Sequence, residues 1–140
     1  MSRVYWDTML FIYLIEDSPA HRARVSHLLQ RHQERGDQLC SSYLGLGELL
    51  AGTYKRGREA TEDIREAFFS TAVQILPWDE EAAEVFARIR AKYRLAIADS
   101  IHLACAAAGK TDLFLTADKQ LTKMIVPGIH FIADMNTELL

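Results

Sequence analysis

Four carboxylates stand in stretches of sequence that otherwise favour burial. They are Asp7 between VYW and TMLFIYLI, Glu48 within YLGLGELLAG, Asp99 between LAIA and SIHLACAAA, and Asp118 after LFLTA. An ionised carboxylate removed from water is costly unless a cation or several donors meet it. Three of these acids could simply cap the helix that follows them. Glu48 has no such explanation, because it falls in the middle of a predicted helix, and the four together predict a functional cluster.

The residue types limit the chemistry of such a cluster. No CxxC and no paired-histidine spacing is present, so a zinc site is not indicated. Carboxylate oxygens are ligands that suit Mg²⁺ or Mn²⁺. A divalent ion held this way activates water and neutralises charge developing on a phosphate. The acids therefore predict metal-dependent phosphodiester hydrolysis without a Ser, Cys or His nucleophile.

The elements that must position these acids alternate between strand and helix along the chain. Such alternation predicts an α/β fold with three layers, in which helices cover both faces of a mostly parallel sheet. Neither an internal repeat nor a linker interrupts it, so we expect one domain over residues 1–140. The expected strands are 3–6, 38–42, 72–76, 113–115 and 130–132, and the expected helices are 9–15, 19–35, 43–55, 59–71, 80–93, 98–108 and 118–124.

In open parallel sheets, sites form beyond the carboxyl ends of the strands. Asp7 follows the first strand directly, and Glu48 lies early in the helix after the second. Asp118 comes shortly after the strand at 113–115, and Asp99 opens the helix before that strand. We therefore expect all four acids at one edge of the sheet. Asp112 precedes its strand and is expected at the opposite edge.

The segments VYWDTMLFIYLIE, LGELLAG, IADSIHLACA and LFLTADKQL resemble, in order and spacing, the PIN domain of VapC-type ribonuclease toxins. The resemblance covers essentially the whole chain. It implies that Asp7, Glu48, Asp99 and Asp118 hold Mg²⁺ or Mn²⁺ and position a water that cleaves single-stranded RNA, leaving 5′-phosphate and 3′-hydroxyl ends. It implies supporting hydroxyls at Thr8 and Thr116, a homodimer, and a small antitoxin protein as partner. The chain departs from the family pattern at Met9 and Ala117, where polar residues are common.

Two weaker signals concern the substrate. His102 lies one helical turn after Asp99, so it could contact a phosphate or a carboxylate, although a hydrogen-bonded core histidine is the simpler interpretation. The basic run Lys55, Arg56 and Arg58 follows the helix of Glu48 and is a candidate RNA or partner contact.

Charge and cysteine content set the remaining expectations. The net charge of −3 argues against a broad basic nucleic-acid surface, but without the four site acids it becomes +1. Cys40 and Cys105 are expected to be buried thiols of a protein in the reducing cytoplasm. No apolar run is long enough to span a membrane.

Other functions remain open at this point. A non-catalytic PIN-fold binding module would keep the fold without the activity, and a PIN ribonuclease of RNA processing would cut RNA without being a toxin. An aspartyl phosphatase would show DxDxT where this chain has Asp7-Thr8-Met9. A receiver domain would lack an equivalent of Glu48.

Overall fold

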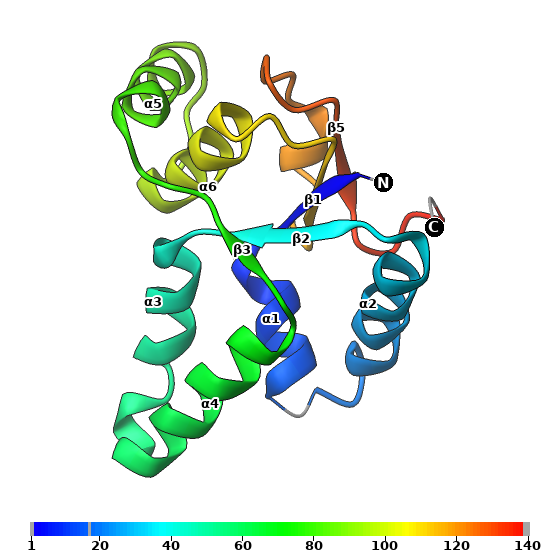
Figure 1. The fold of residues 1–140 in the computed structure, drawn as a ribbon. Coiled ribbons are helices and arrows are strands. Elements are labelled where there is room, and N and C mark those ends of the chain that lie inside the picture. Colours follow the sequence, from blue (N-terminus) through cyan, green and yellow to red (C-terminus); the bar gives the residue numbers. More distant parts are fainter. Residues whose placement is uncertain (1, 17, 139–140) are drawn as a thin grey trace.

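The computed structural model describes residues 2–16 and 18–138, and its centre is a five-stranded parallel sheet (Figure 1). The strand order is β3-β2-β1-β4-β5, and every adjacent pair is parallel. Tyr5 of the central strand is in register with Cys40 on one side and Phe114 on the other. The strands are β1 (Arg3–Trp6), β2 (Gln38–Ser41), β3 (Gln74–Ile75), β4 (Leu113–Thr116) and β5 (Phe131–Asp134).

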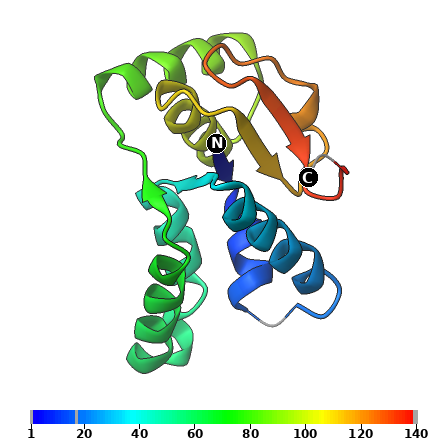
Figure 2. The ribbon, with the colours of Figure 1, turned by 45° about the vertical axis from the view of Figure 1, so that its right-hand side comes forward.

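Helices cover both faces of this sheet, which confirms the three-layer α/β/α prediction. Because side chains alternate along a strand, Val4 and Trp6 pack in the core beneath α1 to α4, whereas Tyr5 packs with α5 and α6. Figures 1 and 2 show the two helical layers on opposite sides of the strands. The helices are α1 (Thr8–Ile15), α2 (Arg22–Arg35), α3 (Tyr43–Ala51), α4 (Arg58–Ser70), α5 (Glu80–Lys92) and α6 (Ile97–Ala108), with short 3₁₀ turns η1 (Tyr54–Arg56) and η2 (Leu121–Lys123).

Several element boundaries differ from those expected. Helix α2 begins at Arg22 rather than at residue 19, because the Ser18 carbonyl accepts hydrogen bonds from the amides of His21 and Arg22 and closes a turn there. The strand at 72–76 shortens to β3, since Ala72 has a left-handed φ of 60° at the end of α4. Gly36, with φ of 71°, ends α2 as predicted.

The two helices expected at 43–55 and 118–124 are also shorter. Helix α3 ends at Ala51, and η1 continues to Gly57, whose φ of 103° forces the chain to turn into α4. Of the second predicted helix only η2 forms. Asp79 caps α5, since its carboxylate accepts from the Ala82 amide at 2.9 Å.

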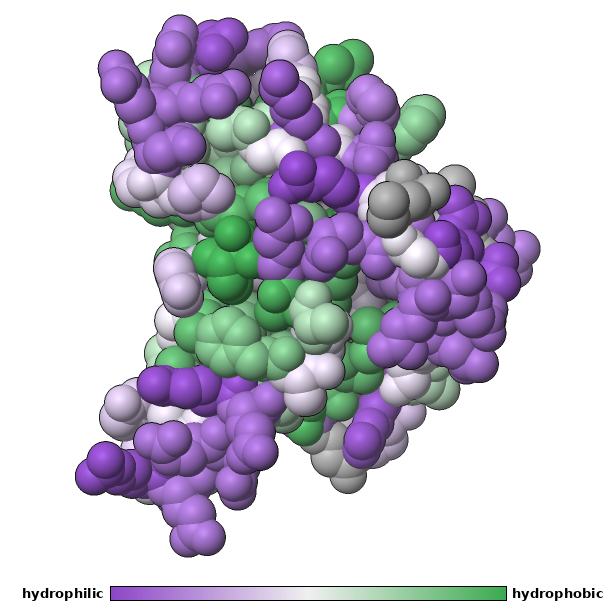
Figure 3. All heavy atoms as spheres, viewed as in Figure 1, coloured by the Kyte–Doolittle hydropathy of each residue, from purple (hydrophilic) through white to green (hydrophobic). Residues whose placement is uncertain are grey.

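The surface in the view of Figure 3 is hydrophilic over α5, over α2 and at the tip of the α3–α4 hairpin, with apolar residues gathered between them. Cys40 and Cys105 are free thiols and both are buried, as expected. None of the described helices has the length and apolar character that crossing a membrane requires.

Candidate active site

Asp7 links the first strand to the first helix at the carboxyl edge of the sheet. Its amide donates to the Leu115 carbonyl of β4 at 2.9 Å, which fixes the chain as it leaves β1. One carboxylate oxygen, Oδ1, accepts from the Thr8 amide and caps α1. The other, Oδ2, accepts from the Thr116 hydroxyl at 2.9 Å. Asp7 thus fulfils the capping role and is also tied to the end of β4.

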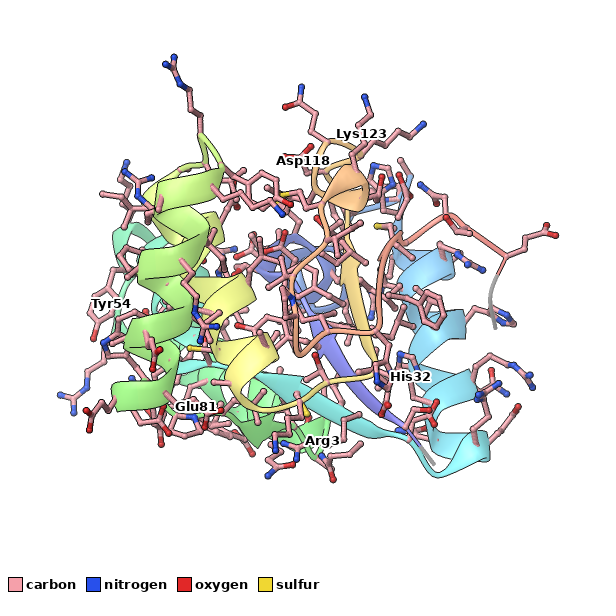
Figure 4. All side chains as sticks on the ribbon, turned by 90° about the horizontal axis from the view of Figure 1, so that it is seen from above. Arg3, His32, Tyr54, Glu81, Asp118 and Lys123 are labelled. Atoms are coloured by element: carbon pink, nitrogen blue, oxygen red, sulfur yellow. The ribbon has the colours of Figure 1, made fainter. Side chains whose placement is uncertain are left out.

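Thr116 connects two of the acids. Its buried side-chain oxygen donates to Asp7 Oδ2 and accepts from the Asp118 amide at 3.0 Å. Asp118 itself is exposed, contrary to the burial that its sequence context suggests, because β4 ends at Thr116 and the chain turns outward. Figure 4 shows Asp118 at one end of the strands and Arg3 at the other.

Glu48 reaches the same edge from α3. Its Oε1 accepts from the Thr8 hydroxyl at 2.8 Å and lies 2.5 Å from Nε2 of His102. The hydrogen bond with His102 is the main reason that the pKa of Glu48 is lowered, despite partial burial. Gly45 lets α3 lie this close to β2, because an added Cβ would stand 2.6 Å from the Ser41 hydroxyl.

Asp99 is placed differently from the other acids. It lies in the first turn of α6, and in the described part of the chain its carboxylate has neither a hydrogen bond nor an ion pair. Burial raises the pKa of Asp99 most, and the negative charges of Asp7, Asp118 and Glu48 raise it further. The four carboxylates are therefore close enough to repel one another, and the structure brings all four predicted acids to one edge of the sheet.

The donor set is that of a hard divalent cation, although the site is not preformed around one. Among residues 2–16 and 18–138, no three His, Cys, Asp or Glu side chains stand close enough together to surround a metal ion. Mg²⁺ keeps several waters and often takes only one or two carboxylates directly. Four acids that have no Lys or Arg partner among the described residues fit a hydrated ion of this kind, because a cation would offset the repulsion that adds to burial in raising the pKa of Asp99.

The structure buries one of the weaker candidates and leaves the basic run at the surface. His102 is only 2% exposed, which corrects a direct phosphate contact and favours a hydrogen-bonded core histidine. Lys55, Arg56 and Arg58 lie exposed at the tip of the α3–α4 hairpin, and Arg56 pairs with Glu16 at 2.9 Å.

Sequence reasoning missed two residues that support the site, Tyr5 and Ser42. Their hydroxyls join the hydrogen bonds behind Glu48. Tyr5 reads as an ordinary core aromatic in a strand, and its hydroxyl is the only hint of a polar role, since a buried Tyr hydroxyl normally needs a partner.

The family model of the PIN domain matches residues 4–125. Because this match spans most of the chain, the chain belongs to the PIN domain family. A search among curated proteins found no match.

Solved structures with the same fold are toxin–antitoxin complexes. A chain of VapBC from Salmonella typhimurium bound to DNA has 22% identity and a TM-score of 0.76, with 96% of this chain and 99% of that chain covered. A chain of VapBC2 from Rickettsia felis, bound to a DNA fragment from its promoter, has 15% identity and a TM-score of 0.77, with 94% of this chain and 98% of that chain covered. A chain of VapBC-5 from Mycobacterium tuberculosis has 19% identity and a TM-score of 0.62, with 96% of this chain and 99% of that chain covered.

Proposed function

We propose that the protein is a Mg²⁺- or Mn²⁺-dependent endoribonuclease that cuts single-stranded RNA, and that it is the toxin of a toxin–antitoxin pair. The observation that supports this most is a group of four carboxylates at the carboxyl edge of a PIN fold, none of which pairs with a Lys or Arg within the described residues. A protein that only used this fold for binding would gain nothing from acids that repel one another.

The chain's own residues divide the work at this edge. Asp7, Glu48, Asp99 and Asp118 would hold the ion, which supplies an activated water and neutralises charge on the phosphate. Thr116 holds the orientation of Asp7 through its hydroxyl, and Thr8 holds that of Glu48. Asp99 is the acid best able to take part in binding, because no hydrogen bond within the described residues has to be broken first.

The partner follows from the same likeness. The similar structures are complexes of toxins with antitoxins, two of them bound to DNA. We propose that this chain likewise binds a small antitoxin protein and forms a homodimer in the cytoplasm.

Cleavage of total RNA with Mg²⁺ or Mn²⁺, followed by mapping of new 5′ ends, tests the activity. We expect discrete cuts by the wild type and none by Asp99→Asn at equal folded concentration. Cuts that persist in Asp99→Asn would reject the acidic edge as the active site. A wild type that neither cuts RNA nor binds Mn²⁺ would instead indicate a non-catalytic PIN-fold binding module. Cutting without a cognate antitoxin would indicate a PIN ribonuclease of RNA processing.

A further inference from the structure

A continuous chain of buried hydrogen bonds runs behind Glu48. The Tyr5 hydroxyl donates to Ser42 Oγ at 2.8 Å and lies 2.7 Å from Nδ1 of His102. On the other side of the ring, Nε2 lies 2.5 Å from Oε1 of Glu48. All three side chains behind Glu48 are buried: Ser42 is the N-cap of α3, Tyr5 lies in β1 and His102 in α6. Three elements are therefore joined to one carboxylate by polar contacts in the core.

These contacts hold one carboxylate oxygen of Glu48, and the other oxygen has no hydrogen bond from the described residues. An ionised carboxylate can only accept, so Nε2 of His102 carries a proton and donates it. Thr8 donates to the same oxygen, Oε1, at 2.8 Å. No hydrogen bond from the described residues reaches Oε2. The orientation of Glu48 is thus set through Oε1 alone, and Oε2 keeps its full capacity as an acceptor.

Core packing does not account for the polar atoms of this chain. The Tyr5 ring stacks on Phe114 with centroids 5.1 Å apart, and it meets the His102 ring edge-on at 5.8 Å. A phenylalanine and a leucine would fill the same space without the cost of removing a hydroxyl and an imidazole from water. A buried hydrogen-bond network instead specifies one arrangement of the groups that it contacts.

The local sequence of α3 brings Glu48 to this network. Ser42 caps the helix by accepting from the Gly45 amide at 3.3 Å, so the residue that starts the helix also contacts Tyr5. The bare Cα of Gly45 lies against the network, since a Cβ there would stand 3.7 Å from Cε1 of His102 and 2.6 Å from the Ser41 hydroxyl. Glu48 then follows almost one helical turn later, on the same face.

We propose that His102 is a positioning residue, held by Tyr5 and Ser42, that fixes Oε1 of Glu48 so that Oε2 is free to bind a divalent cation. This inference rests on the proposed function, because it assigns a role to Glu48 within the same acidic edge. His102 touches neither substrate nor ion and acts only through Glu48. Outer contacts of this kind change metal affinity by about 10- to 100-fold when they are removed from metal sites.

Two matched substitutions of His102 separate its nitrogens. The amide nitrogen of a glutamine can stand near the position of Nε2, and that of an asparagine near the position of Nδ1. Calorimetric titration with Mn²⁺ should show His102→Gln within about threefold of the wild-type Kd and His102→Asn weaker by about 10-fold or more. Tyr5→Phe keeps the ring stack with Phe114 and should weaken Mn²⁺ binding several-fold, although Tyr5 is linked to Glu48 only through His102.

The outcomes distinguish this inference from the proposed function. Loss of Mn²⁺ binding in Asp99→Asn with wild-type affinity in His102→Asn would overturn the positioning role and leave the nuclease proposal standing. Equal weakening of Mn²⁺ binding in His102→Asn and His102→Gln would also overturn it, since the imidazole ring and not the Nε2 donor would then be what matters. Absence of Mn²⁺ binding by the wild type would reject both. If His102→Asn does not fold, an unchanged Kd in Tyr5→Phe is the result that overturns the inference.

Discussion

The two edges of the sheet treat their acids in opposite ways. At the amino edge, Asp37 Oδ2 lies 3.3 Å from Nε of Arg35 and 3.4 Å from Nδ1 of His32, and its Oδ1 accepts from the Ser2 amide. Asp112, at the same edge, accepts from the Arg3 amide and lies 3.3 Å from His130. At the carboxyl edge, within residues 2–16 and 18–138, no Lys or Arg forms an ion pair with any of the four site acids.

This difference separates acids that have a basic neighbour from acids that have no Lys or Arg partner among the described residues. Asp37 has a buried side chain and neighbours that offset its charge. Asp99 is half-buried, and burial together with the charges of the other three carboxylates raises its pKa. Removing an acid such as Asp37 should lower the stability of the fold, whereas removing an acid such as Asp99 should relieve repulsion between carboxylates.

The largest expected effect is that of Asp99→Asn on RNA cleavage. The amide cannot bind the cation as a carboxylate does, so cleavage should fall by at least about 100-fold. Because folding raises the pKa of Asp99, its ionised carboxylate lowers the free energy of unfolding at neutral pH, and the neutral amide should leave the thermal midpoint unchanged or higher. Cleavage assays together with thermal unfolding test both parts, and a clear drop in midpoint would contradict the comparison.

Asp37→Asn should show the reverse pattern. The asparagine can keep the bond from Ser2, but its NH₂ group would face the N–H groups of His32 and Arg35. Setting an NH₂ group against the buried N–H of His32 costs about 1–3 kcal/mol, whereas the Arg35 side chain is partly exposed and can turn to water. Urea unfolding should therefore show a loss of this size, while RNA cleavage per folded molecule stays at the wild-type level. Loss of cleavage in the folded variant would mean that the two edges are not independent.

A third prediction concerns pH and the buried His32. Its Nε2 accepts from the Trp6 indole at 3.1 Å, so protonation would set two donors against each other. Burial lowers its pKa below 6.5, an effect that the nearby Asp37 opposes and Arg35 reinforces. The unfolded chain therefore binds a proton at a higher pH than the folded chain, and the free energy of unfolding should fall as pH drops below about 6.5.

Urea unfolding between pH 5 and 8 tests this prediction, with His32→Gln as the control. One proton accounts for at most about 1.4 kcal/mol per pH unit. The variant should lose this share of the pH dependence and keep the rest, which comes from other groups. An identical pH profile in both proteins would show that His32 does not couple protonation to folding.

The sequence predicted the alternation of elements and the edge at which the acids meet, because both follow from local patterns and from the geometry of parallel strands. It could not predict that Asp118 is exposed or that α2 starts at Arg22. The first depends on where β4 ends, and the second on the turn closed by the Ser18 carbonyl. Both are settled by a few hydrogen bonds that no periodicity records.

The same limit applies to the contacts of the site. That His102 would meet Glu48 and Tyr5 rather than solvent depends on how α6 packs across β1 and against α3. The spacing of His102 from Asp99 indicates only a shared side of one helix. Residues far apart in the chain define the network, and their distances arise only in the folded core.

The smallest expected effect concerns the basic tip of the α3–α4 hairpin. Arg56 and Glu16 are both partly exposed, so Arg56→Ala should cost less than about 1 kcal/mol of stability. The phosphates of an RNA bound as proposed would need positive charge from outside the acidic edge, and the exposed Lys55 and Arg58 have no ion pair among the described residues. If this tip contacts RNA, Lys55→Ala with Arg58→Ala should weaken binding and reduce the slope of log affinity against log salt by about 0.7 per lost contact. An unchanged slope would assign the tip to the solvent-exposed surface, because only direct phosphate contacts release counterions.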